Sequence, residues 1–242
     1  MTALARLKPL EAIASLLYPP ACTICAASVE AGEYLCADCN AKTTPIVPPF
    51  CEICSEPFAG AITSSFTCAN CAHRKIYFNT AVAVYRSRGI VRRVIHDFKY
   101  GHQIHLRHLV AHWLIEALDD VRLRGRRFDV IIPVPLHPAR ERERGFNQAA
   151  LLAELISERM SIQSKPILKR IRYTITQTAF DRAERMENLR NAFRLRENMN
   201  VRSLRVLLID DVLTTGSTLS ECARVLKDAG ALSVYAATAA RG

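Results

Sequence analysis

Residues 206–218 read Val206-Leu-Leu-Ile-Asp210-Asp211-Val-Leu-Thr214-Thr215-Gly216-Ser217-Thr218. The aliphatic run predicts a buried strand over 205–209 that ends at two carboxylates. A turn rich in hydroxyl groups follows, and the apolar spacing of 219–229 predicts a helix that is stopped by Gly230. In open α/β sheets, ligands bind at the carboxyl edge of the strands. Free N–H groups at the start of a helix favour a phosphate, while carboxylates suit sugar hydroxyls or the water shell of a magnesium ion.

Strand and helix patterns alternate around this stretch. The additional strands are predicted at 81–85, 128–134 and 232–238, and the additional helices at 90–100, 104–118 and 148–159. This alternation predicts the α/β class, with a mainly parallel sheet covered by helices on both faces. Residues 169–191 are polar, rich in arginine and poorly periodic, so we expect a long mobile loop there.

Eight of the nine cysteines form four Cys-x-x-Cys pairs near the start of the chain. Ten residues separate the first two pairs and thirteen separate the last two; the pairs are Cys22/Cys25, Cys36/Cys39, Cys51/Cys54 and Cys68/Cys71. Two such pairs can complete a tetrahedral four-thiolate site with no open position, which is typical of structural zinc. We therefore expect two zinc ions in a small module over residues 1–74, with sequential or interleaved use of the pairs. The α/β domain would follow over 75–242.

Disulfides and iron–sulfur clusters also use paired cysteines. Disulfides need an oxidising compartment, whereas Met1–Pro20 is predicted as a short helix rather than a signal peptide, so a cytoplasmic location is expected. An iron–sulfur cluster is held by four thiolates, but the ligand type and spacing favour zinc. No run of apolar residues is long enough to cross a bilayer. The ninth cysteine, Cys222, falls in a predicted helix and is expected to be buried.

The stretch at 206–218 resembles the phosphoribosyl pyrophosphate motif of type I phosphoribosyltransferases. Other segments are similar to the ComF family of competence-associated proteins. These are Phe98-Lys99-Tyr100-Gly101, the segment 129–148 with its Arg144-Gly145-Phe146-Asn147, the series Gln177…Arg185…Asn188…Phe193, and the cysteine module. The resemblance implies a phosphoribosyltransferase fold behind a zinc ribbon and, in competent bacteria, a part in handling incoming single-stranded DNA. It leaves the acceptor substrate open.

The resemblance also assigns residues to a bound phosphoribosyl pyrophosphate. It implies that Asp210 and Asp211 hold the ribose hydroxyls, that the turn Thr214, Thr215, Gly216, Ser217 and Thr218 holds the 5′-phosphate, and that Mg²⁺ accompanies the ligand. The pyrophosphate side is expected to comprise Lys99, His137, Arg140, Arg144 and Gly145. A mobile loop with Gln177, Arg182 and Arg185 is expected to close over the site. The arginines of 140–144 alternate with Glu141 and Glu143, which also fits a solvated, self-paired run.

Charge is unevenly distributed along the chain. Residues 73–242 hold 30 basic and 17 acidic side chains, a net charge of +13, while the whole chain carries +10. A basic body suits phosphate-rich ligands, nucleic acid or both. Two functions therefore stay open: a phosphoribosyltransferase, and a non-enzymatic adaptor for single-stranded DNA that works with competence proteins.

Overall fold

The computed structural model describes residues 19–60, 66–173 and 189–242. Its contacts divide the chain into two compact units, Met1–Thr43 and Thr44–Gly242. The first and second cysteine pairs lie in the small unit, and the third and fourth pairs lie in the large one. The compact units meet between Thr43 and Thr44, whereas the sequence predicted a domain boundary near residue 74. That boundary stays a prediction.

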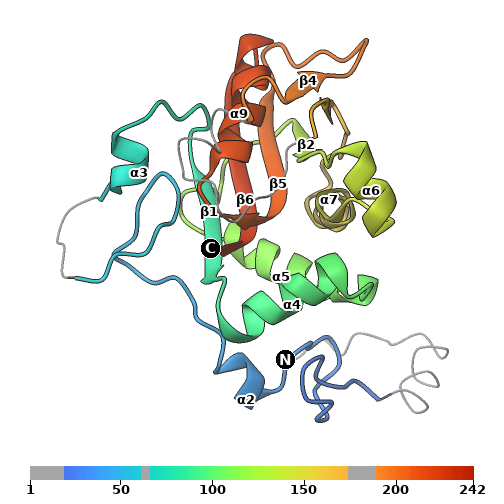
Figure 1. Ribbon diagram of the computed structural model, residues 1–242. Helices are drawn as coiled ribbons and strands as arrows, with labels where there is room; N and C mark the ends of the chain where they lie inside the picture. Colours follow the sequence, from blue (N-terminus) through green and yellow to red (C-terminus); the bar gives the residue numbers. More distant parts are fainter. Residues whose placement is uncertain (1–18, 61–65, 174–188) are drawn as a thin grey trace. The chain divides into compact units, whose positions relative to one another are not determined.

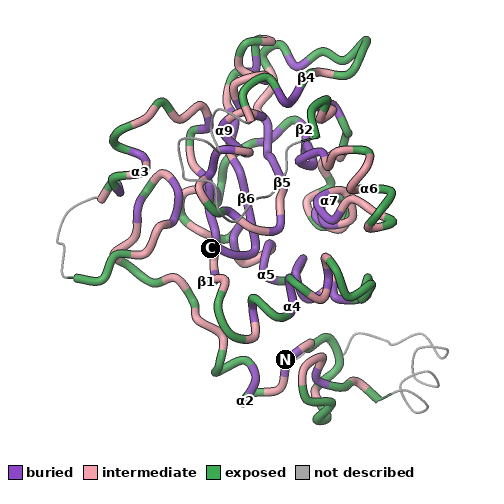
Figure 2. The backbone as a smooth tube through the Cα atoms, in the orientation of Figure 1, coloured by how far each residue is buried: buried purple, intermediate pink, exposed green. Residues whose placement is uncertain are grey.

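The large unit is built on a four-stranded sheet in the order β1-β6-β5-β2, with every neighbouring pair parallel (Figure 1). The strands are β1 (Ala81–Arg86), β2 (Val130–Pro133), β5 (Arg205–Leu213) and β6 (Ser233–Arg241). Figure 2 shows that β5 and β6 are buried along most of their length. Strands buried on both faces need near-continuous apolar sequence, which the runs 206–209 and 130–134 supply.

Helices cover both faces of the sheet. Helix α5 (Arg107–Leu118) packs on β1 and β6, α7 (Gln148–Met160) packs on β2 and β5, and α4 (Gly89–Tyr100) lies against α5. Helix α9 (Ser217–Asp228) packs on β6 and β4. Val206 and Leu208 share a buried cluster with Cys222 of α9. Because side chains alternate along a strand, Leu207 and Ile209 face the other helices. The α/β class with a mainly parallel, doubly covered sheet is confirmed.

Several short elements were not expected from the sequence. Strands β3 (Leu168–Arg170) and β4 (Phe193–Leu195) form an antiparallel pair at the two ends of the segment expected to be a loop. Helix α6 (Pro138–Arg144) forms in the arginine-rich segment for which no helix was predicted. The remaining short elements are α2 (Ala37–Asn40), α3 (Ala69–Ala72) and the 3-10 turn η1 (Ile104–Leu106). Among the described residues, every helix is too short or too polar to span a bilayer.

Candidate functional site

Strand β5 carries both adjacent carboxylates near its carboxyl end, where their side chains have different neighbours. It continues through them to Leu213, so Asp210 and Asp211 lie within the strand rather than beyond its end. Asp211 is almost fully buried, and its Oδ2 lies 2.6 Å from Nζ of Lys99 at the end of α4. Asp210 lies near Cys222 of α9, since burial and the Asp210 charge together raise the pKa of that thiol. The Oδ1 atom of Asp210 accepts a hydrogen bond of 2.9 Å from the backbone N–H of Asp211. The two carboxylates of the motif therefore differ: Asp211 forms an ion pair with Lys99, whereas Asp210 bonds to a backbone N–H.

Asp210 is held in an electrostatically unfavourable place. Burial and the neighbouring charge of Asp211 raise the pKa of Asp210 well above its ordinary value, although the Lys99 charge acts the other way. A cation or a hydrogen-bond donor placed beside this carboxyl would stabilise its ionised form. The site is therefore arranged to take up positive charge or hydroxyl groups at this edge of the sheet.

The turn between β5 and α9 has the conformation needed to cradle an anion. Gly216 adopts a left-handed conformation with φ of +75°, which strongly favours glycine, and α9 begins at the next residue. The Thr215 and Ser217 hydroxyls are 2.9 Å apart, and the Ser217 N–H donates to Oγ1 of Thr215 at 3.3 Å. Hydroxyl donors and the first N–H groups of a twelve-residue helix thus gather in one short turn.

A basic cavity of about 380 Å³ adjoins the acidic pair. Its lining comprises Lys99, Tyr100, His102, Arg140, Glu143, Arg144 and Tyr173. Lys99 belongs to both places, because the same side chain lines the cavity and pairs with Asp211. The Arg144 guanidinium lies 4.9 Å from the Tyr100 ring centre, and Arg140 lies 5.6 Å from that of Tyr173. Two arginines are therefore held by aromatic rings at the wall of one cavity.

The two segments that form this cavity are joined by an aromatic contact. Phe98 of α4 stacks on Phe146 with ring centres 5.5 Å apart. Gly101 ends α4, and a Cβ there would lie 2.8 Å from the Asp97 carbonyl oxygen. Each residue of Phe98-Lys99-Tyr100-Gly101 therefore has a structural role. Phe98 is a buried anchor, Lys99 supplies a positive charge, Tyr100 supplies an aromatic ring, and Gly101 allows a tight end to the helix.

His137 and Gly145 frame α6. The Nδ1 atom of His137 accepts a hydrogen bond of 3.2 Å from the Ala139 N–H and so caps the helix. Burial and the charges of nearby arginines, Arg170 first, lower the pKa of His137, which favours the neutral ring. Gly145 ends the helix with φ of +85°, and a Cβ there would meet no atom within 4 Å. Its left-handed backbone, which few residues other than glycine adopt, is a sufficient reason for a glycine here.

Of the expected pyrophosphate-side residues, Lys99, Arg140 and Arg144 meet in the basic cavity. Arg142 is exposed and does not line the cavity, which fits the alternative of a solvated arginine. Gln177, Arg182 and Arg185 lie outside the described residues.

Some residues near the site gave no signal in the sequence. Burial lowers the pKa of Arg170 of β3, and this residue is close enough to Asp210 for the Asp210 charge to act in the opposite direction. Tyr173 contacts both His137 and Arg140. Arg170 and Tyr173 belong to a stretch of sequence without periodicity. Arg170 is placed near the site by the pairing of β3 with β4, and Tyr173 follows three residues later.

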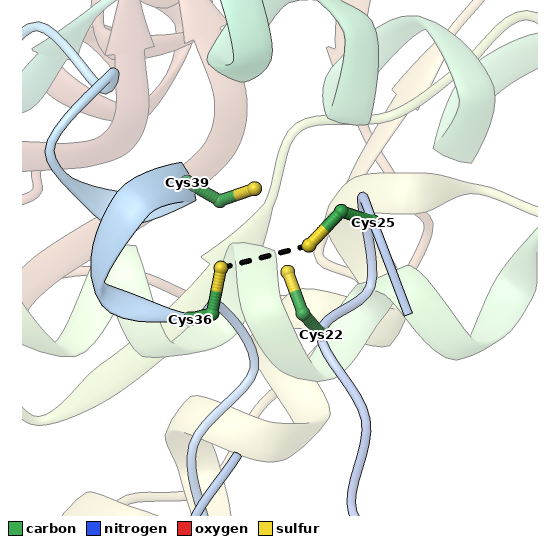
Figure 3. A group of neighbouring side chains, drawn as sticks. All are labelled: Cys22, Cys25, Cys36 and Cys39. Atoms are coloured by element: carbon green, nitrogen blue, oxygen red, sulfur yellow. Dashed lines mark hydrogen bonds between the residues drawn. The ribbon is translucent and has the colours of Figure 1, made fainter. Parts of the chain in front are cut away.

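The cysteines form two separate four-sulfur clusters with sequential pairing. One contains Cys22, Cys25, Cys36 and Cys39 (Figure 3), and the other contains Cys51, Cys54, Cys68 and Cys71. The sulfurs within each cluster lie within 4.8 Å of one another, and the Cys25–Cys36 and Cys54–Cys68 sulfurs are 3.6 Å apart. A tetrahedral zinc site with Zn–S bonds of about 2.3 Å requires sulfurs about 3.8 Å apart. Both clusters therefore fit a zinc ion.

The second cluster is more deeply buried than the first. All four of its sulfur-bearing residues are buried, whereas Cys25 in the first cluster is exposed. The thiols of this cluster interact closely: hydrogen bonds from Cys54 and Cys71 lower the pKa of Cys51, and the hydrogen bonds with Cys51 raise the pKa of Cys54 and Cys71. Cys222 is fully buried in α9, as expected.

Comparison with known proteins agrees with this architecture. A double zinc ribbon domain family matches residues 13–72, and a phosphoribosyl transferase domain family matches residues 147–242. Competence protein F of Haemophilus influenzae is 32% identical over 200 residues, which cover 81% of this chain and 85% of that protein. The DNA utilization protein YhgH of Escherichia coli K12 is 30% identical over 223 residues, covering 90% and 96%.

Among solved structures, a purine phosphoribosyltransferase from Pyrococcus horikoshii aligns with 55% of this chain and 83% of its own, at 19% identity and a TM-score of 0.36. The expected type I phosphoribosyltransferase fold, preceded by a cysteine-rich zinc-ribbon region, is confirmed by the family matches and the two cysteine clusters. Since its similarity to competence protein F extends over most of both proteins, the chain belongs to the ComF family of competence-associated proteins.

Proposed function

We propose that this chain binds phosphoribosyl pyrophosphate together with Mg²⁺ along the edge of the sheet formed by β5 and the start of α9. The observation that carries the proposal is the adjacency of three features: the acidic pair, the hydroxyl-rich turn and a basic cavity that shares Lys99 with the pair. A ribose flanked by a monophosphate on one side and a pyrophosphate on the other would meet each of them in turn.

The turn suits the 5′-phosphate. Residues 214–218 offer three threonine hydroxyls, one serine hydroxyl and the N–H groups that begin α9, where the helix dipole favours negative charge. The motif stands between a buried strand and a helix, which is the setting in which such turns bind phosphate.

The acidic pair suits the ribose. Asp210 and Asp211 can accept hydrogen bonds from two sugar hydroxyls, and either can hold Mg²⁺ directly or through water. When bound, Mg²⁺ would neutralise charge on the pyrophosphate oxygens. The raised pKa of Asp210 fits this role, because a cation nearby would stabilise its ionised form.

The basic cavity suits the pyrophosphate. Lys99, Arg140 and Arg144 bring three positive charges, and Glu143 brings one negative charge. Arginine forks bind phosphate oxygens through paired hydrogen bonds. His137 and Gly145 act here by fixing the two ends of α6, which carries both arginines.

A bound phosphoribosyl pyrophosphate is set up for displacement at its anomeric carbon. An acceptor's lone pair would form the new bond to this carbon while the bond to the pyrophosphate oxygen breaks, and the electron pair of that bond leaves with the pyrophosphate. The chain's own residues would hold the ribose and stabilise the departing charge, with no covalent intermediate.

A second function, direct binding of single-stranded DNA, is supported by different observations. The relatives carry the names competence protein and DNA utilization protein, and residues 73–242 have a net charge of +13. A positively charged surface that follows a nucleic-acid backbone needs no sequence motif. We propose that the family's role in DNA uptake extends to this chain.

Titration calorimetry with phosphoribosyl pyrophosphate and MgCl₂ tests the first proposal. We expect one site per chain, and we expect Asp210→Asn to weaken binding at least about tenfold, because it removes a charged acceptor. Asp228→Asn is the matched control, since Asp228 ends α9 and pairs with Arg224 away from the turn. Equal affinity in wild type and Asp210→Asn would refute the assignment. A pyrophosphate-release screen over candidate acceptors would then identify the substrate.

A further inference from the structure

The segment that carries the last cysteine pair reaches the phosphate-binding turn. Asn70 lies between Cys68 and Cys71, and its Nδ2 donates to the Thr215 carbonyl oxygen at 3.2 Å. Arg74 follows three residues after Cys71; it donates to the same carbonyl and, at 3.2 Å, to Oγ of Ser217. Two side chains of the zinc ribbon therefore hold the turn from one side.

These contacts fix the direction of one peptide group. The peptide unit is planar and trans, so its C=O and N–H point in opposite directions. Because Asn70 and Arg74 hold the Thr215 carbonyl toward the ribbon, the N–H of Gly216 is directed away from the ribbon. That leaves the N–H available to an anion on the other side of the turn.

Gly216 is closely packed on the ribbon side. A Cβ at Gly216 would lie 3.2 Å from Nη2 of Arg74 and 3.6 Å from the Phe78 ring. Arg74 also brings a positive charge next to the turn. Arg74 follows the short helical turn that carries Cys68 and Cys71 of the second cluster, in which the Cys71 and Ala72 N–H groups both donate to the Cys68 carbonyl oxygen.

We propose that the second zinc ribbon is part of the phosphate site. Arg74 and Asn70 are positioning residues that orient the turn. Arg74 also supplies positive charge for the bound 5′-phosphate. The inference rests on the proposed function. It predicts that affinity for a 5′-phosphate depends on metal in the cluster of Cys51, Cys54, Cys68 and Cys71, and not on metal in the first cluster.

A purely structural role for Arg74 makes a different prediction. Other contacts already hold the ribbon in place: Cys51, Cys54, Cys68 and Cys71 belong to the same buried cluster as Phe78, Leu213 and Leu219. The Tyr77 N–H also donates to Oγ of Ser220 in α9 at 3.3 Å. If Arg74 only added to this attachment, its loss would lower the melting temperature and leave ligand affinity unchanged.

The test compares two probes that share parts of the ligand. Ribose 5-phosphate would use the turn, whereas inorganic pyrophosphate would use the basic cavity. For Arg74→Gln we expect affinity for ribose 5-phosphate and for phosphoribosyl pyrophosphate to fall about tenfold or more, because a charge-assisted contact is lost. Affinity for inorganic pyrophosphate should stay within about twofold, and zinc content should be unchanged.

Two further variants separate charge from geometry. Arg74→Lys keeps the charge but loses the planar fork, so we expect an intermediate loss of affinity for ribose 5-phosphate. Asn70→Ala should weaken the same probe less than Arg74→Gln, since a neutral hydrogen bond is lost. Arg124→Gln, at an exposed position before β2, is the matched control and should change none of the affinities.

The outcomes are distinguishable. Full affinity of Arg74→Gln for ribose 5-phosphate, in a wild type that binds this probe, would overturn the inference and leave the proposed function standing. A wild type that binds neither ribose 5-phosphate nor phosphoribosyl pyrophosphate would overturn both. Equal losses for ribose 5-phosphate and inorganic pyrophosphate would show a general disturbance of the fold and would also count against the inference.

Discussion

Asp210 is a residue at which stability and binding oppose each other. Its pKa is raised in the folded protein by burial and by Asp211, so the folded state binds a proton more readily than the unfolded state does. Its effect on stability is therefore most favourable below the unfolded pKa of about 4 and becomes less favourable as pH rises through the folded pKa. Above that unfolded pKa, the raised pKa of Asp210 makes the folded state less stable than it would be with an ordinary carboxyl.

Replacing Asp210 with asparagine should therefore raise the melting temperature at pH 7. The gain should shrink as pH falls toward 4, because the carboxyl is then protonated in the unfolded state as well as in the folded state. Thermal melts at several pH values measure this, with Asp228→Asn as a control that carries an exposed carboxyl. A lower melting temperature for Asp210→Asn at pH 7 would contradict the electrostatic argument.

Asp211 shows what the sequence could and could not predict about the site. The motif predicted a buried strand that ends at two carboxylates, whereas β5 continues through them to Leu213. A side chain beyond the end of a strand could be removed with little effect on the fold, but Asp211 is buried and paired with Lys99. Removing it leaves a largely buried lysine without its charge partner, which costs stability. The pair joins residues 112 positions apart, so no local pattern could reveal it.

At the scale of elements, local signals were reliable and long-range ones were absent. The strand predicted at 205–209 and the helix predicted at 219–229 correspond to β5 and α9, because apolar periodicity and turn chemistry are local signals. Helix α6 was missed because its charged residues define no apolar face, although Pro138 at its first position is a known start signal. Asn70 and Arg74 contact Thr215 across 145 and 141 positions, and only the folded chain brings them together.

The two cysteine clusters differ in how they join the rest of the molecule. The second cluster is built into the large unit: Oγ of Ser55 donates to the Ala81 carbonyl oxygen and accepts from the Ala83 N–H of β1, both at 3.1 Å. The first cluster belongs to the separate small unit. Loss of metal should therefore have different consequences at the two sites.

We expect Cys51→Ser to lower the melting temperature of the large unit by about 4 to 8 °C, as a loss of about 2 kcal/mol would do in a unit of this size. Cys22→Ser should leave that transition unchanged. The single tryptophan, Trp113, is buried in α5 and reports the large unit's transition by fluorescence. Zinc analysis should give two ions per wild-type chain and one in each variant. An unchanged Trp113 transition in Cys51→Ser would show that the second cluster folds independently.

At the scale of the whole molecule, the basic charge of residues 73–242 predicts how any binding of single-stranded DNA responds to salt. Each phosphate neutralised on a single strand contributes about 0.7 to the slope of log affinity against log salt. If the DNA passes the basic cavity, changing Arg140 and Arg144 to alanine removes two such contacts. The slope should then fall by about 1.4.

The control for this experiment removes the same charge elsewhere. Arg124 and Arg127 are exposed and precede β2, so they lie toward the amino ends of the strands, away from the edge that carries Asp210. Changing both to alanine should leave the slope unaltered, as measured by fluorescence anisotropy of a labelled oligonucleotide over a range of salt concentrations. Equal effects of the two double variants would mean that net charge, rather than a track past the cavity, attracts the strand. Absence of binding at every salt concentration would rule out direct contact, and the link to DNA uptake would then run through a protein partner or through the small-molecule chemistry of the site.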